Sequence, residues 1–158
     1  MKAATVTQLK KELQHLSEAE LIETCLRLAK FKKENKELLS YLLFEADNED
    51  GYIQSIKEEM DDEFDSINTS SYYFIKKSVR KILRNLKKYI RYSKKDETQV
   101  ELLIYFCQKL GNLEPNIKHN TVLTNTYHRQ LALAKNCLLK MHEDIQYDYN
   151  LEIENLKL

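Results

Sequence analysis

Apolar side chains recur every three or four residues along almost the whole chain, which is the spacing of one face of an α-helix. The clearest seam opens at Ser70-Ser71 and runs to about residue 92. Its apolar positions are Tyr72, Ile75, Val79, Ile82, Leu86 and Tyr89. The pattern predicts about seven helices. They cover residues 7–14, 17–32, a third segment that stops before Asp47, and then 52–67, 71–92, 96–110 and 121–149. The tail 150–158 fits either a docked last turn or a frayed end.

Several residues mark where these helices begin and end. Ser17 and Glu20 have the spacing of a capping box, which opens the second helix. Asp96 with Gln99 has the same spacing and predicts the start of the sixth helix, which ends at Gly111. The acidic run 47–51 reads as the clearest turn in the chain.

The chain holds only two Gly and one Pro in 158 residues. Because hairpins and tight turns draw on Gly, Pro, Asn and Asp, so few turn residues disfavour sheets. We therefore predict an all-α fold of about seven helices packed as antiparallel helical hairpins, in a bundle or a short α-solenoid. The length predicts a single helical domain over residues 1–158.

Nothing in the sequence resembles a signal peptide or a membrane-spanning run of apolar residues. Cys25, Cys107 and Cys137 lie far apart in apolar helical patterns, so we expect reduced thiols buried in the core. These features predict a cytoplasmic protein with no membrane association.

The net charge of zero hides a division between neighbouring helices. Residues 45–65 contain ten acidic side chains and one base, whereas residues 66–95 contain ten bases and no acid. Like charges at i,i+4 spacing weaken a helix. Something must therefore offset the repulsion in both segments.

Two interpretations of this charge pattern stay open. Either the two helices pack as a hairpin and neutralise each other along their flanks, or the basic face of residues 76–95 binds an external polyanion. If both apolar stripes face the core, only flanking charges can pair, and part of the basic strip stays exposed. The candidate partner-binding residues are Lys77, Arg80, Lys81, Arg84, Lys88 and Arg91.

No motif in the sequence predicts a metal, a cofactor or a catalytic site. If Gly51 took the sixth position of an EF-hand loop, Ala46 and Lys57 would stand at its ends, where oxygen ligands are needed. Glu12 and His15 form a single Glu-x-x-His step, and di-iron bundles need two such steps. His128 and His142 would lie about 21 Å apart on one helix. Gly-rich phosphate loops, nucleophile elbows and paired-Cys motifs are missing.

We therefore expect no cofactor. The predicted function is that of a non-enzymatic scaffold or adaptor, which uses the acidic helix and the basic helix that follows it. An acidic protein is the partner that this reading favours. The alternative is a nucleic-acid-binding protein, which the acidic neighbouring helix disfavours because it weakens the positive field. A third hypothesis is an enzyme whose distant side chains converge on a pocket between helices.

The first quarter of the chain also resembles known families. The opening of the chain resembles the start of an uncharacterised family of small helical bacterial proteins. The segments that carry the resemblance are Leu9-Lys10-Lys11-Glu12-Leu13, Leu16-Ser17, Leu21-Ile22-Glu23 and Lys33-Glu34-Asn35-Lys36-Glu37-Leu38-Leu39. That resemblance implies a helical architecture and a bacterial source, and it assigns no site residues. The opening is also similar to the SAP motif, a DNA-binding helix-turn-helix that begins L-K-x-E-L. The SAP motif has a longer, Gly-containing linker than His15-Leu16, and this departure removes most of the support for DNA binding through this segment.

Overall fold

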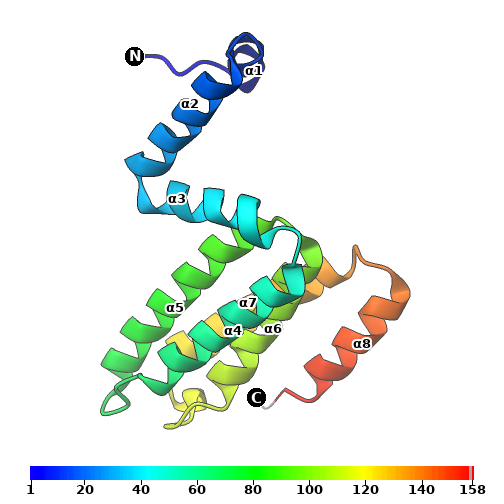
Figure 1. Ribbon diagram of the computed structural model, residues 1–158. Helices are drawn as coiled ribbons and strands as arrows, with labels where there is room; N and C mark the ends of the chain where they lie inside the picture. The colour runs from blue at the N-terminus through cyan, green and yellow to red at the C-terminus, as the bar shows by residue number, and fades with distance from the viewer. Residues whose placement is uncertain (157) are drawn as a thin grey trace. The chain divides into compact units, whose positions relative to one another are not determined.

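The structure, a computed structural model, describes residues 1–156 and 158. Eight α-helices and no strand are found among them, which confirms the predicted all-α class (Figure 1). Two short turns interrupt the series, a π-helical one called η1 (Tyr41–Glu45) and a 3₁₀ one called η2 (Ile117–His119). The helices are α1 (Val6–Leu13), α2 (Glu18–Phe31), α3 (Lys33–Ser40), α4 (Glu49–Asp65), α5 (Tyr72–Ser93), α6 (Asp96–Gly111), α7 (Thr121–Leu138) and α8 (Glu143–Glu154).

The chain, expected as one domain over 1–158, divides into two compact units, residues 1–44 and residues 45–158. The first unit contains α1, α2 and α3. Thr5 caps α1 and Ser17 caps α2, each with a complete capping box. An extended residue, Lys32, separates α2 from α3 and produces the bend between them (Figure 1).

The second unit has a continuous apolar core around α6. Helix α6 packs against α4, α5 and α7, and α4 packs against α5. Phe106 of α6 is fully buried, and its ring centroid lies 5.8 Å from that of Phe64 on α4. The predicted stripe of α5 is buried at Ile75, Val79, Ile82 and Leu86. Every one of these side chains therefore contributes to the free energy of unfolding through burial.

The prediction of one long helix over residues 121–149 is wrong. Helix α7 ends at Leu138, and α8 begins at Glu143. The ring nitrogen Nδ1 of His142 accepts a hydrogen bond from the backbone N–H of Asp144 and so caps α8. The side chains of His128 and His142 therefore lie on different elements.

Three smaller expectations are corrected as well. Asp96 is the first helical residue of α6, and its N-cap is Lys95, which makes no side-chain cap. Helix α4 begins at Glu49 because Asn48 caps it, so the turn is shorter than the acidic run 47–51. Cys25 is exposed, whereas Cys107 and Cys137 are buried, and all three are free thiols.

Among the described residues, no helix combines the length and the apolar character that crossing a membrane requires.

Candidate interaction surface

Helix α5 has an apolar face and an opposite basic face. At about 100° per residue, the six candidate residues lie about 130–170° around the helix from the middle of the buried stripe. The helix carries eight Lys and Arg and no acidic residue. Because the apolar stripe packs on the rest of the unit, the basic stripe is turned away from the core.

The six candidate residues differ in their surroundings. The Nζ of Lys81 lies 3.5 Å from a carboxylate oxygen of Glu63 on α4. The Nζ of Lys88 lies 4.7 Å from the ring centroid of Tyr89. The other four are exposed, and the structure gives their side chains no ion pair or hydrogen bond with another described residue. These are Lys77, Arg80, Arg84 and Arg91.

A polar seam on the flank of α5 faces the acidic helix α4. The side chains of Lys81 and Asn85 both contact the Glu63 carboxylate, Asn85 Nδ2 at 3.3 Å. One turn further along α5, the Tyr89 hydroxyl donates to Glu59 at 2.9 Å. In this seam, Lys81 is the residue of α5 that forms an ion pair with α4, whereas Asn85 and Tyr89 are neutral donors.

A second polar seam connects α4 to α6. The Lys57 ammonium lies 2.6 Å from Glu101, and the Lys109 ammonium lies 3.0 Å from Asp61. The Tyr105 hydroxyl also donates to Asp61, at 2.7 Å. Several carboxylates of α4 are thus engaged by α6 or by neutral donors of α5.

This second seam shifts two pKa values. Burial raises the pKa of Asp61, but the hydrogen bonds from Tyr105 and Lys109 outweigh it, so the net pKa is lowered. Burial and the hydrogen bond to Asp61 raise the pKa of Tyr105 to about 12. Both shifts favour a charged Asp61 and a neutral Tyr105 at pH 7.

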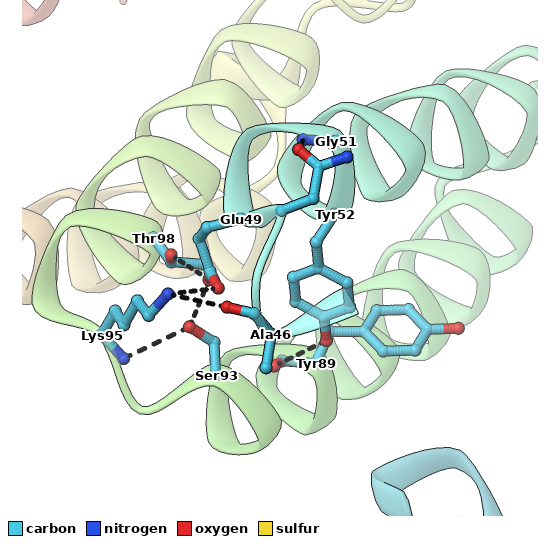
Figure 2. Close-up of polar contacts among 9 residues, drawn as sticks. Ala46, Glu49, Gly51, Tyr52, Tyr89, Ser93, Lys95 and Thr98 are labelled. Carbon is cyan, nitrogen blue, oxygen red and sulfur yellow. Dashed lines mark hydrogen bonds and ion pairs between the residues drawn. The ribbon is translucent and has the colours of Figure 1, made fainter. Parts of the chain in front are cut away.

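The C-terminal end of α5 is fixed by a cluster around Glu49 (Figure 2). The Glu49 carboxylate accepts hydrogen bonds from the hydroxyls of Ser93 and Thr98, and it lies 2.9 Å from the Lys95 ammonium. Between Ser93 and Lys95, the backbone of Lys94 is left-handed with φ of 58° and ends α5. The cluster thereby joins the start of α4 to the turn between α5 and α6.

Two aromatic side chains lie at the other end of α5. Tyr73 is 67% exposed and Phe74 is 43% exposed, and their rings meet edge to face at 5.3 Å. Tyr73 falls in the angular sector of Arg80 and Arg84. The basic face therefore begins with an exposed aromatic ring.

The sequence analysis predicted neither polar seam, although each seam corresponds to a row of polar residues at helical spacing. On α5, the residues Lys81, Asn85, Tyr89 and Ser93 repeat at i,i+4 and follow one flank of the apolar stripe. On α6, Thr98, Glu101, Tyr105 and Lys109 repeat at three and four residues. Such a polar row beside an apolar row predicts a helix flank that faces a polar neighbour.

The described residues contain no group of three His, Cys, Asp or Glu side chains placed to hold a metal ion. A pocket of about 380 Å³ lies beside α6 and α8, and Glu152 is its one ionisable lining residue. That lining offers no nucleophile paired with a base.

Comparisons of the chain with protein-family models, with curated proteins and with solved structures found no match.

Proposed function

We propose that residues 45–158 form a non-enzymatic interaction module, and that the basic face of α5 binds an acidic segment of a partner protein. One observation carries this proposal. Lys77, Arg80, Arg84 and Arg91 are exposed opposite the core, and no described carboxylate pairs with them. Like charges repel along a helix, so an acidic ligand would relieve a cost that the fold leaves in place.

The spacing of these cations indicates the length of the expected ligand and the spacing of its carboxylates. From residue 77 to residue 91 the stripe extends about 21 Å, at about 1.5 Å per residue. An acidic helix with carboxylates at i,i+3 and i,i+4 spacing would match it over about four turns. Three of the four cations are arginines, whose planar guanidinium binds a carboxylate through two parallel hydrogen bonds.

The surroundings of α5 favour a protein over a nucleic acid. Residues 45–158 contain 17 basic and 19 acidic side chains, so the net charge of this unit is −2. On α4, Glu58, Asp62 and Asp65 are exposed and point away from the core. Affinity for a phosphate backbone depends on an uncompensated positive field, which these carboxylates reduce.

Nucleic acid is the second candidate, and Tyr73 is the observation in its favour. An exposed ring at the end of a cationic stripe resembles the stacking platforms of single-strand binders. In that case Tyr73 would stack on a base while Arg80 and Arg84 contact phosphates.

A charge-reversal pair tests the proposal. We expect Arg80→Glu with Arg84→Glu to abolish binding of a labelled acidic helical peptide, measured by fluorescence anisotropy. The matched control reverses Lys135 and Lys140, two exposed cations on α7 and the turn after it. We expect the control to bind like the wild type.

The same assay separates the two candidate ligands. A single-stranded RNA that binds more tightly than the peptide, with a steep loss of affinity at higher salt, would replace the protein proposal by the nucleic-acid one. Peptide binding that survives the Arg80/Arg84 reversal, or is lost equally in the control, would contradict the assignment to α5.

We further propose a reducing, cytoplasmic location. The three free thiols support it.

A further inference from the structure

The unit formed by residues 1–44 has ordered helices but almost no core of its own. None of the residues of α1, α2 or α3 is buried. Eleven large apolar side chains between Val6 and Phe44 are 36–83% exposed. Helices of this length are marginal in water unless an apolar face is covered. A unit this small normally needs a disulfide, a metal or an oligomer partner, and its one cysteine, Cys25, is a free thiol.

The exposed apolar area has the size that a dimer interface requires. At roughly 100 Å² for each fully exposed Leu-sized side chain, these eleven residues present roughly 600 Å² of apolar surface. A standard interface takes about 800 Å² from each partner, and somewhat more than half of that is apolar. These side chains are distributed over α1, α2, α3 and η1, and four of them lie on α2 (Ile22, Leu26, Leu28 and Phe31), so the area matches a dimer interface when the whole unit takes part in the contact.

We propose that this unit is a homodimerisation element in which α2 packs antiparallel against α2 of a second copy. The contact stripe contains Glu18, Ile22, Cys25 and Ala29 on α2, and it ends at Lys32, the extended residue that follows the last turn of the helix. These residues follow one another at four, three, four and three positions, which is the spacing of a helix–helix seam. Cys25 and Ala29 also line an apolar groove of about 370 Å³ between α2 and α3, together with Leu28 and Leu38. Small side chains at the centre of the stripe allow the two helices to approach closely.

The charges on this stripe favour a second copy over an unrelated partner. Glu18 begins the stripe and Lys32 ends it, both are exposed, and Cys25 lies midway between them in the sequence. An antiparallel pairing centred on Cys25 brings Glu18 of each copy next to Lys32 of the other. The stripe is thus complementary to itself under a twofold rotation, as an isologous interface requires. This inference is independent of the role proposed for α5.

Oligomeric state and thiol crosslinking test the proposal on the full chain. We expect sedimentation to show a monomer–dimer equilibrium between nanomolar and high micromolar protein. Diamide, which accepts two electrons and two protons from two thiols, should link the dimer through Cys25. Cys107 and Cys137 are buried, so Cys25→Ser should remove the crosslink without removing the dimer.

Charge exchange tests the register. We expect Glu18→Lys alone and Lys32→Glu alone each to weaken dimerisation by about tenfold, since two ion pairs become two repulsions. The double variant should restore the wild-type affinity. Glu23→Lys, the same substitution on the opposite face of α2, is the matched control and should leave the equilibrium unchanged.

Three results would overturn the proposal. A chain that stays monomeric throughout would show that a second copy does not cover this surface. A dimer that Cys25 does not crosslink would exclude the antiparallel register. A double variant no tighter than either single variant would exclude the pairing of Glu18 with Lys32.

Discussion

Replacing Glu49 with Ala tests whether the first turn of α4 holds the end of α5 in place. The Glu49 side chain is 15% exposed and lies at the centre of the cluster with Ser93, Lys95 and Thr98 (Figure 2). Its loss would leave the hydroxyl of Thr98, which is 1% exposed, without this acceptor. The substitution therefore removes a charged acceptor and strands a buried donor at the same time.

The magnitude follows from the three contacts. A hydrogen bond to a charged group contributes about 1.5–3 kcal/mol, and most of that applies to Thr98 because its hydroxyl is buried. The Ser93 hydroxyl is less buried and should add about 1 kcal/mol. Lys95 is half exposed, so its ion pair adds less than about 1 kcal/mol. We expect Glu49→Ala to lower the free energy of unfolding by about 3–4 kcal/mol.

Urea unfolding followed by far-UV circular dichroism measures this change. Asp50→Ala is the control, because Asp50 also lies in the first turn of α4 but is exposed. It should cost only the helix-dipole contribution, about 0.3–1 kcal/mol.

A double-mutant cycle isolates the hydrogen bond from Thr98. In a Thr98→Val background, Glu49→Ala should cost about 1–2 kcal/mol less than in the wild type, because no hydroxyl is stranded. Two results would refute the reasoning, namely a Glu49→Ala cost no larger than that of Asp50→Ala, or additive costs in the cycle.

Three further predictions concern single residues. Lys94→Gly should raise the free energy of unfolding by about 1 kcal/mol, because a left-handed backbone disfavours side chains with a Cβ; an unchanged or lowered urea midpoint would contradict this. Gln130 is 3% exposed and its side-chain carbonyl accepts no hydrogen bond from a described residue, so Gln130→Met should stabilise the protein by about 1 kcal/mol in the same assay. Asp61 has a lowered pKa in the folded state, so its stabilising effect is present above the unfolded pKa and is lost as pH falls through the folded pKa. The stability difference between wild type and Asp61→Asn should therefore be constant near neutral pH and shrink below about pH 4; a difference that grows with acidity would contradict it.

The sequence was sufficient to predict features that depend on local spacing. The capping box of Ser17 and Glu20 is present as predicted. Four of the six predicted positions of the α5 stripe are buried, and the two tyrosines at its ends, Tyr72 and Tyr89, are half-buried. Both depend on residues three or four apart, whose meeting a helix guarantees.

The break between α7 and α8 was missed because the apolar period continues across it without Gly or Pro. A charge signal was nevertheless present. Lys140 follows the end of α7, and Glu143 and Asp144 form the first turn of α8. Cations near a helix C-terminus and acids at the next N-terminus are the order that the helix dipole favours.

Exposure was harder to predict than secondary structure, because it depends on which elements come together. Cys25 lies in an apolar helical pattern like those of Cys107 and Cys137, yet it is exposed while they are buried. The difference lies in the neighbours. Helix α6 is covered by α4, α5 and α7, whereas the helices of residues 1–44 have no comparable layer within their unit.

The same dependence on neighbours explains how a chain of zero net charge can present a basic face. If the acidic side chains of α4 paired with the basic side chains of α5 all along the two helices, neither helix would present a charged face. Instead, α4 directs Asp61 toward α6 and engages Glu59 through the neutral hydroxyl of Tyr89. The exposed carboxylates Glu58, Asp62 and Asp65 point away from the core, as the arginines of α5 do, and no ion pair joins these two sets of described residues. The exposed arginines thus follow from the direction in which each helix turns its charged face, which the composition of the two helices does not reveal.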